Sequence, residues 1–373
     1  MATASAERTV VKTTVVAGAG GSCADVQVHI APPREFGNTR AMQTFHAGLH
    51  LVLRRRIGHV SLILLALLAP SALAFDLQGH RGARGLAPEN TLAAFERALE
   101  IGVTTLELDI AITSDGIPVI SHEPALFEAI TRDAQGQWLK GRGPLIKSLS
   151  LAQVQTFDVG RNNPTTPYGR QFPSQAPRDG QRIPTLASLF KRVKDLGADD
   201  VQFDIETKVL PTKPDDTVAP DEFVDILFAT IREAGMTERV MVQSFDWRTL
   251  QRIQKLEPRV RTVYLTNQHR NFNNVADGTW TAGMLPAQHA SVAHMVKASG
   301  GAIWSPNFAD ITADMVKSAQ ALGLKVIPWT VNDASDADRL IGWGVDGIIS
   351  DYPDRMREVM RQRGMPLPTG LKR

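Results

Sequence analysis

The stretch Thr104-Thr-Leu-Glu-Leu-Asp-Ile-Ala-Ile112 has a strict alternating pattern. Leucine or isoleucine stands at every second position from 106 to 112, with polar or small residues between them. This period of two predicts a β-strand that carries Glu107 and Asp109 on one face and apolar side chains on the other. In a parallel barrel the apolar face packs on the surrounding helices. The stretch therefore predicts two carboxylates inside a barrel, near the carboxyl ends of its strands.

Outward from this strand, short β-rich runs alternate with amphipathic helical segments. The expected strands are Asp76–Gln78, Thr104–Ile112, Val201–Glu206, Val240–Ser244, Arg261–Leu265, Ala302–Trp304, Lys325–Thr330 and Gly347–Ser350. The expected helices are Glu89–Ile101, Leu186–Leu196, Asp221–Ala234, Trp247–Lys255, Ser291–Ala298, Ala313–Leu322, Asp336–Ile341 and Pro353–Arg363. Eight strands, each followed by a helix, predict an α/β fold of the (β/α)8 TIM-barrel type rather than an open sheet.

One interval is too long to be an ordinary connection. About eighty residues separate His122 from the strand that begins at Val201. We therefore expect an insertion after the second strand region, at about residues 123–185. Its middle, residues 158–184, is rich in proline, asparagine, glycine and arginine. This part is either a disordered loop or an ordered lid; we favour the lid, because long loops on barrels commonly carry function.

The N-terminal region resembles a secretory signal. Arg54, Arg55 and Arg56 precede an apolar run at residues 60–69, and Ala72 and Ala74 follow it. A basic start, an apolar core and small residues before the cleavage point predict cleavage after Ala74 and export to the periplasm. The alternative is a buried core helix.

The sequence before the arginines is unusually long for a signal peptide. A start codon assigned too early, with Met42 as the real start, explains it most simply. We therefore expect residues 1–74 to be a leader and residues 75–373 to form the barrel domain.

Charge and cysteine content exclude several classes of function. The chain has 41 basic and 39 acidic side chains, of which seven and three lie in residues 1–74, leaving 34 basic and 36 acidic. This balance gives no support for nucleic-acid binding. No apolar stretch is long enough for the mature chain to span a membrane. Cys23 is the only cysteine and lies in the leader, so thiol catalysis, disulfides and cysteine-bound zinc are excluded from the mature chain.

Glu107 and Asp109 are candidate metal ligands. Two unpaired carboxylates inside a barrel repel each other and lose hydration. A divalent cation relieves both costs, and an all-oxygen site favours Ca²⁺ or Mg²⁺. The alternative for this pair is an internal salt bridge to an arginine.

The strand at Val201–Glu206 supplies further polar residues on one face. Glu206 ends this strand and is the natural third ligand for the cation. Lys208 follows on the same face, where it can hold a phosphate oxygen as a point charge. Asp204 lies deeper, so we expect it to support the ligands or to form an internal ion pair.

His80 and His122 each follow a short β-rich run. A single histidine in such a place is more often structural than catalytic, but two beside three acids point to a shared site. They could bind the metal. Because carboxylates already suffice for a hard cation, and because imidazole titrates near neutral pH, we assign them to proton transfer.

Short motifs along the chain resemble the glycerophosphodiester phosphodiesterases, in particular the bacterial periplasmic type. The motifs are Gln78-Gly-His-Arg-Gly82, Pro88-Glu-Asn-Thr91, Glu107-Leu-Asp109, Ser121-His-Glu-Pro124, Ile183-Pro-Thr-Leu186, Asp204-Ile-Glu-Thr-Lys208, Gln243-Ser-Phe245, Trp329-Thr-Val-Asn332 and Asp346-Gly-Ile-Ile-Ser-Asp351. They keep the family's order and extend over nearly the whole of the mature chain, which makes the match specific.

The resemblance implies a TIM-type barrel whose insertion follows the second histidine, and it implies a role for each candidate residue. Glu107, Asp109 and Glu206 would bind one divalent cation, most simply Ca²⁺, with Mg²⁺ as the alternative. His80 and His122 would be acid and base. The remaining roles are phosphate contacts from Arg81 and Lys208, a glycerol pocket lined by Trp329, and support of the ligands by Glu89, Asp204 and Gln243.

One position departs from the family pattern. Where the family commonly has aspartate after the second histidine, this chain has Glu123. The carboxylate is kept, so we expect activity with a changed orientation of His122. We also expect Glu89 and Asn90 to start the first helix.

The sequence therefore predicts an enzyme that hydrolyses glycerophosphodiesters, such as glycerophosphocholine and glycerophosphoethanolamine, to sn-glycerol 3-phosphate and an alcohol. We favour His80 as the base and His122 as the acid. The nucleophile is either water or a glycerol hydroxyl that passes through a cyclic phosphate. The alternatives are a phospholipase D-like or phosphoinositide phospholipase barrel, which the polar 158–184 segment disfavours, and a non-catalytic protein that binds glycerophosphodiesters.

Overall fold

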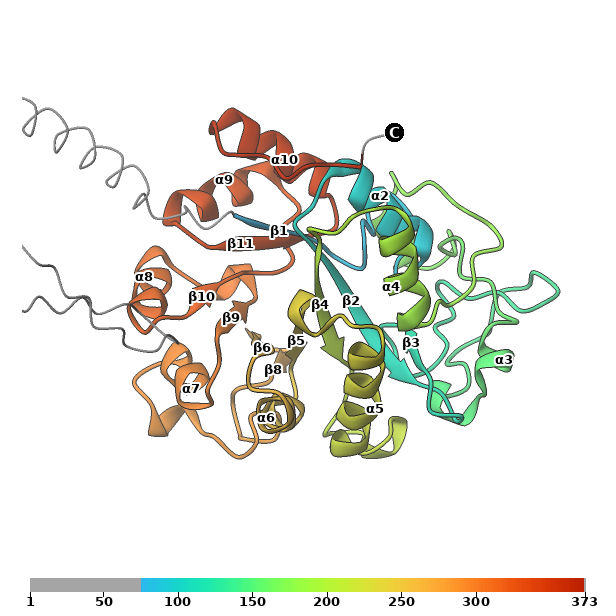
Figure 1. Cartoon of the computed structure of the whole chain (residues 1–373), viewed down its shortest axis with the longest axis horizontal. Coiled ribbons are helices and arrows are strands. Elements are labelled where there is room, and N and C mark those ends of the chain that lie inside the picture. Colours follow the sequence, from blue (N-terminus) through green and yellow to red (C-terminus); the bar gives the residue numbers. More distant parts are fainter. Residues whose placement is uncertain (1–74, 372–373) are drawn as a thin grey trace, which may run out of the picture. The chain divides into compact units, whose positions relative to one another are not determined.

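The computed structural model describes residues 75–371 and shows a nearly closed barrel of eight parallel strands (Figure 1). The strands follow one another around the barrel in the order β10-β9-β6-β5-β4-β2-β1-β11. Their bounds are β1 Asp76–Gly79, β2 Thr105–Ile112, β4 Gln202–Thr207, β5 Val240–Ser244, β6 Arg261–Thr266, β9 Ile303–Pro306, β10 Lys325–Val326 and β11 Gly347–Ser350. The predicted fold class is confirmed. The predicted leader, residues 1–74, lies outside the described residues.

Backbone hydrogen bonds join the first and last members of this order. Asp346 N–H donates to Val326 O at 2.9 Å, and Ile349 N–H donates to Pro328 O at 3.0 Å. The strand predicted to run to Thr330 is regular only over Lys325–Val326. Pro328 has no N–H to offer a neighbouring strand, so regular pairing stops before it although the chain continues along the barrel wall.

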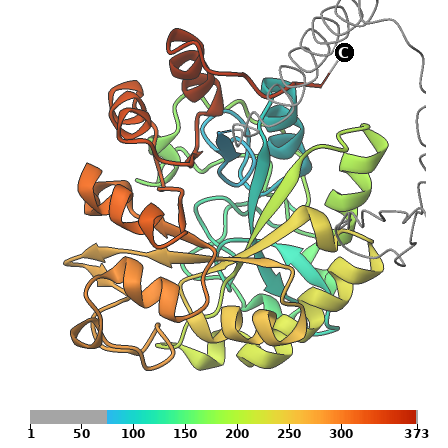
Figure 2. The same ribbon diagram turned by 60° about the vertical axis from the view of Figure 1, so that its left-hand side comes forward.

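Helices surround the strands (Figures 1 and 2). The long helices are α2 Leu92–Ile101, α4 Leu186–Asp195, α5 Pro220–Glu233, α6 Trp247–Leu256, α7 Val292–Ala298, α8 Ala313–Ala321, α9 Ala334–Trp343 and α10 Pro353–Gln362. Short 3-10 turns lie between them at η3 Pro214–Asp216, η4 Thr237–Arg239, η5 Pro286–Gln288 and η6 Phe308–Asp310, beside a small hairpin of β7 Gln268–His269 and β8 Phe272–Asn273. Within residues 75–371, none of these helices combines the length and apolar character that crossing a membrane requires.

The first helix begins later than predicted. Asn90 has a left-handed backbone, with φ of 55°, and Thr91 caps the helix by accepting a hydrogen bond from Ala94 N–H. Helix α2 therefore starts at Leu92, and Glu89 and Asn90 belong to the loop before it. This frees both side chains to point at the barrel mouth, where they contact the site described below.

The barrel interior has two different sides. On the β5, β6, β9, β10 and β11 side it holds an apolar cluster, made of Met241, Val263, Ile303, Ile327 and Ile349. On the other side β2 and β4 carry acidic side chains, and the register places Glu107 beside Asp204 and Asp109 beside Glu206. The outward face of β2 packs on the helices, as its alternation predicts.

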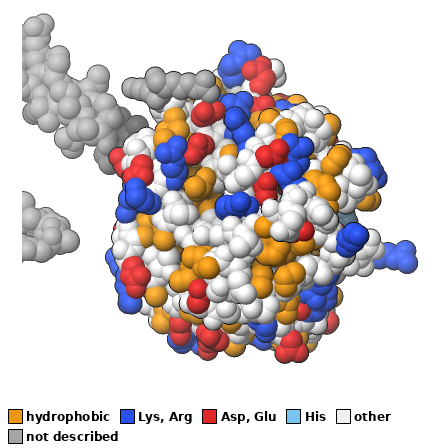
Figure 3. Space-filling model, turned by 90° about the vertical axis from the view of Figure 1, so that its right-hand side faces the viewer, with side chains coloured by type: hydrophobic (Ala, Val, Ile, Leu, Met, Phe, Trp, Pro, Cys, Tyr) orange, Lys and Arg blue, Asp and Glu red, His pale blue; other side chains and the backbone are white. Residues whose placement is uncertain are grey.

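The insertion between β2 and α4 has a small core of its own. It begins with β3 Pro118–Ile120, which pairs antiparallel with β2, and continues through η1 Ile146–Ser148, α3 Leu151–Val154 and η2 Gly169–Gln171. Its buried cluster consists of Val119, Leu126, Ile146, Val154, Val159 and Ile183, packed on Ala111 of β2. This core agrees with an ordered insertion rather than a loose loop. On the face that carries it, basic and acidic side chains are interspersed (Figure 3).

Candidate active site

Three carboxylates meet where the middle of β2 lies beside the carboxyl end of β4. Each of Glu107, Asp109 and Glu206 offers an oxygen, and these atoms lie within 4.8 Å of one another. All three residues are buried. The parallel register of β2 and β4 brings Asp109 directly beside Glu206, which is why two strands suffice to build the cluster.

The electrostatics of this cluster favour a cation. Burial, together with the neighbouring Asp109, raises the pKa of Glu107 well above its usual range. Burial also raises the pKa of Glu206 to about 7. Burial opposes ionisation of Asp109 too, but His122, Arg81 and Lys208 lower its pKa. Buried oxygens that repel one another fit a hard divalent cation such as Ca²⁺ or Mg²⁺, so the donor set matches the predicted metal.

Three hydrogen bonds orient the carboxylates from behind. Gln243 Nε2 donates to Glu107 Oε1 at 2.6 Å, and the backbone N–H of Arg81 donates to Glu107 Oε2 at 2.8 Å. Asn90 Nδ2 donates to Asp109 Oδ2 at 2.9 Å. Gln243 thus lies where it was predicted to support a ligand. The role of Asn90 was missed, because it depends on the left-handed turn that ends the loop before α2.

Asp204 lies one pleat deeper than Glu206 and outside the three-acid cluster. Its burial, together with the nearby Asp76, raises its pKa well above the usual range. Asp204 is thus a buried carboxyl beneath the site whose protonated form burial favours, while the charge of Arg261 opposes this shift of its pKa.

Two cationic side chains flank the acids. Arg81 Nε lies 3.2 Å from Asp109 Oδ2, and Arg81 Nη1 donates to Glu89 Oε1 at 2.7 Å. Lys208 Nζ donates to Glu206 Oε1 at 2.8 Å and lies 3.7 Å from Asp109 Oδ1. The structure thus contains both the acid cluster and the arginine salt bridge that were considered as alternatives. The resulting arrangement places two positive charges beside the three carboxylates.

His80 is held by a buried carboxylate at the end of β11. Its Nδ1 lies 2.6 Å from Asp351 Oδ1, while its Nε2 faces the cluster, 3.9 Å from Glu107 Oε2. Arg84 binds both oxygens of Asp351, at 2.9 and 3.0 Å, and Asn332 Nδ2 donates to the second at 2.8 Å. Burial and Arg84 lower the pKa of His80 to about 4, so its imidazole is neutral at neutral pH. Because Asp351 accepts from Nδ1, the free lone pair belongs to Nε2.

His122 has a more exposed partner. Its Nδ1 lies 2.8 Å from Glu123 Oε1, and its Nε2 lies 3.0 Å from Lys208 Nζ. The short run before it, β3, is antiparallel and lies outside the barrel order, so His122 reaches the site from the insertion side. Glutamate at position 123 therefore still contacts the imidazole.

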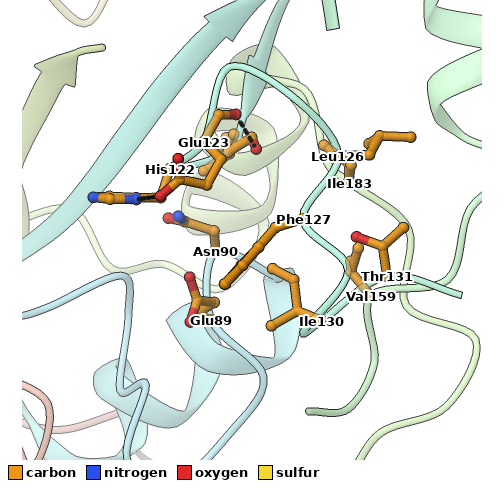
Figure 4. A pocket seen from close by; sticks show the side chains of 12 residues that line it. Glu89, Asn90, His122, Glu123, Leu126, Phe127, Ile130, Thr131, Val159 and Ile183 are labelled. Carbon is orange, nitrogen blue, oxygen red and sulfur yellow. Dashed lines mark hydrogen bonds and ion pairs between the residues drawn. The ribbon is translucent and has the colours of Figure 1, made fainter. Parts of the chain in front are cut away.

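A small cavity of about 20 Å³ lies between the insertion and the site. In Figure 4, Phe127 and Ile130 of the insertion lie on one side of it, and Asn90 and His122 lie on the other. The cavity is large enough for about one water molecule. The insertion thus packs closely against the residues that support the acids.

Trp329 lies within an aromatic group beside Lys208. Its ring meets Phe245 edge to face, with centroids 5.4 Å apart, and its Nε1–H donates to Ser305 O at 3.0 Å. Phe245 lies 5.9 Å from Lys208 Nζ and also packs on Phe272. That Trp329 lines a pocket for the glycerol group remains a prediction.

Comparison with known proteins agrees with the resemblance of the motifs. A family model described as the glycerophosphoryl diester phosphodiesterase family matches residues 80–355. The chain belongs to this family. The predicted enzyme class, a glycerophosphodiester phosphodiesterase, is thereby confirmed.

The relatives align over most of their own length. A glycerophosphodiester phosphodiesterase of Caldanaerobacter subterraneus subsp. tengcongensis is 28% identical, over 76% of this chain and 97% of its own. A solved Silicibacter pomeroyi protein, named as a candidate glycerophosphoryl diester phosphodiesterase, is 35% identical with a TM-score of 0.71, and the match covers 79% of this chain and 96% of that one. An Oleispira antarctica phosphodiesterase, solved with the product sn-glycerol-3-phosphate, shares the fold at 22% identity, a TM-score of 0.57 and 77% and 96% coverage.

Proposed function

We propose that this enzyme cleaves glycerophosphodiesters such as glycerophosphocholine by metal-assisted hydrolysis, with His80 and His122 transferring the protons. The observation that carries the proposal is the cluster of three buried carboxylates with a histidine on either side of it. Glu107, Asp109 and Glu206 would hold one divalent cation. When bound, the cation supplies a positive charge that polarises a phosphate oxygen.

The chain's own cations would hold the phosphate. The Arg81 guanidinium lies against Asp109, and the Lys208 ammonium lies against both Glu206 and Asp109, so a phosphate bound at this cluster would have both cations beside it. As negative charge grows on the phosphate oxygens, these fixed donors stabilise it without rearranging. Trp329 would line the glycerol side of the pocket.

The two histidines would divide the proton transfer. His80 is neutral and presents Nε2 as an acceptor, which suits a base that takes a proton from the nucleophile. His122 would then protonate the departing alkoxide. Burial, Arg81 and Lys208 lower its pKa, and a phosphate bound to these two cations would offset their charge and favour the protonated imidazole beside Glu123. Water and the neighbouring glycerol hydroxyl both fit as nucleophiles, and the second would pass through a cyclic phosphate.

We propose Ca²⁺ as the resident ion. All three predicted ligands are carboxylates, and Ca²⁺ accepts flexible oxygen cages more readily than Mg²⁺, which demands near-octahedral geometry. We also propose that the protein is exported to the periplasm. The basic residues Arg54–Arg56, the apolar run that follows and the small residues up to Ala74 support this proposal.

The metal requirement is tested by chelation. Purified protein is incubated with glycerophosphocholine, with and without EDTA, and the released glycerol 3-phosphate is measured. We expect release to fall to background with EDTA and to return when Ca²⁺ is added in excess. Release that is indifferent to chelation would contradict the metal role.

A pair of matched variants on β4 tests the ligand assignment. Glu206→Gln should abolish the binding of one Ca²⁺ per chain in a calorimetric titration, because it removes a predicted ligand. Asp204→Asn changes the carboxyl two residues earlier on the same strand, which lies outside the three-acid cluster, and should keep the stoichiometry. Equal loss in both variants would refute the assignment.

A further inference from the structure

The insertion contacts the loop between β1 and α2, which carries much of the site. We call residues 168–176 the clasp and residues 80–91 the catalytic loop. Within the clasp, Gln175 Nε2 donates to Arg84 O at 2.8 Å, and Ala176 N–H donates to Leu86 O at 2.9 Å. These two bonds join segments that are about ninety residues apart in sequence. The clasp therefore fixes the backbone of the catalytic loop from outside the barrel.

The hydroxyl of Tyr168 lies where the polar side chains of the catalytic loop converge. It donates to Glu89 Oε2. It also lies 3.4 Å from Arg81 Nη1 and 3.3 Å from Arg84 Nη1, each of which donates to it. The two guanidinium groups carry like charges and repel each other. The Tyr168 oxygen accepts a hydrogen bond from each of them, and the Glu89 carboxylate behind it adds a negative charge, so both groups are held in place.

Each of these arginines also contacts a different part of the site. Arg84 uses Nε and Nη2 on Asp351, the carboxylate that orients His80. Its donors are thus directed at Asp351 and Tyr168, which makes it a support rather than a phosphate ligand. Arg81 instead lies against Asp109 of the acid cluster. The Tyr168 hydroxyl is therefore connected by hydrogen bonds both to Arg81, the proposed phosphate contact, and, through Arg84 and Asp351, to His80.

The ring of Tyr168 is held independently of its hydroxyl. It packs edge to face on Phe127, with centroids 5.1 Å apart, and on Phe172, with centroids 5.5 Å apart. Next to it, a Cβ on Gly169 would lie 2.0 Å from Asn163 O, so the turn that presents the ring requires glycine. Removal of the hydroxyl alone should leave the ring packed between Phe127 and Phe172.

We infer that Tyr168 is a positioning residue of the enzyme: its hydroxyl orients Arg81 and, through Arg84 and Asp351, His80. The inference rests on the proposed function and extends it to the insertion, which becomes a part of the active site rather than a separate cover. Tyr168 touches none of the acids of the metal cluster in this arrangement; it acts through its neighbours.

Steady-state kinetics of Tyr168→Phe test the inference. We expect kcat on glycerophosphocholine to fall about tenfold, as for other groups that orient a catalytic residue, with little change in KM. The matched control is Tyr264→Phe, which loses a buried hydroxyl that donates to Ser299 O at 2.7 Å. Tyr264 lies in β6, and the partners of its hydroxyl, Ser299 and Gln254, lie outside the catalytic loop. Tyr264→Phe should lower the thermal midpoint and keep kcat. An unchanged kcat in Tyr168→Phe, or an equal fall in both variants, would overturn the inference.

Amide hydrogen exchange gives a second readout that needs no activity. Residues 80–91 should exchange faster in Tyr168→Phe than in the wild type, and Tyr264→Phe should leave them unchanged. If the wild type released no glycerol 3-phosphate, the proposed function would fail, and exchange alone would decide whether the hydroxyl fixes the catalytic loop. Equal exchange of this loop in all three proteins would refute the role of Tyr168.

Discussion

The two histidines of the site are built in different ways. The side chain of His80 is 12% exposed and that of its partner Asp351 is 2% exposed, whereas the values for His122 and Glu123 are 28% and 46%. Asp351 is itself fixed by Arg84 and Asn332. His80 thus belongs to a buried network, whereas His122 lies between the buried Lys208 and the more exposed Glu123.

This difference suits two different tasks. A base must present its lone pair to a nucleophile at a fixed place, which a buried and tethered imidazole does well. An acid that serves the leaving group must tolerate alcohols of different size and let them depart, which the more accessible imidazole of His122 allows. The comparison therefore supports His80 as base and His122 as acid.

Removal of His80, the proposed base, should have the largest effect. His80→Ala should lower kcat on glycerophosphocholine by about 10³-fold, within the range for loss of a general base. Circular dichroism and the thermal midpoint should show that the fold survives. Near-normal turnover in this variant would eliminate His80 as the base.

Loss of the carboxylate charge beside each histidine should have the next largest effects on kcat, and the more buried carboxylate should matter more. Asp351→Asn should lower kcat by about 10²-fold, because the amide no longer selects the tautomer with a free Nε2 and leaves Arg84 without its charge partner. Glu123→Gln should cost about tenfold or less, because a carboxylate that is nearly half exposed is more strongly screened by water than a buried one. A larger loss in Glu123→Gln than in Asp351→Asn would reverse the comparison.

The smallest effect should come from the position that departs from the family pattern. Glu123→Asp keeps the charge and shortens the side chain by one methylene. Because this carboxylate is nearly half exposed, we expect kcat to stay within about threefold of the wild type. A loss as large as that of Glu123→Gln would show that the length of the glutamate, and not only its charge, orients His122.

The sequence predicted the parts of the site that depend on strands. Alternation placed Glu107 and Asp109 on one face, and the position of Glu206 at a strand end brought it to the same mouth. The same rule could have found Asp351, which directly follows β11. It was missed because an acid at a strand end has no assigned partner until His80 is placed beside it in space.

The remaining contacts depend on packing between distant segments. Arg84 and Tyr168 are 84 residues apart and meet only once the insertion has folded against the catalytic loop. Nothing in the local sequence of either residue specifies that contact. The start of α2 was misplaced for a related reason: the Asn90 side chain, at a left-handed turn in the loop before α2, donates a hydrogen bond to Asp109 on β2.

The division of labour between the histidines is tested most directly by changing the leaving group. Turnover of wild type, His80→Ala and His122→Ala is compared on glycerophosphocholine and on the p-nitrophenyl ester of glycerol phosphate, whose nitrophenolate leaves without protonation. If His122 is the acid, His122→Ala should recover most of its activity on the nitrophenyl ester, while His80→Ala stays impaired on both substrates. Recovery of His80→Ala instead, or an equal deficit of both variants on both substrates, would contradict the account.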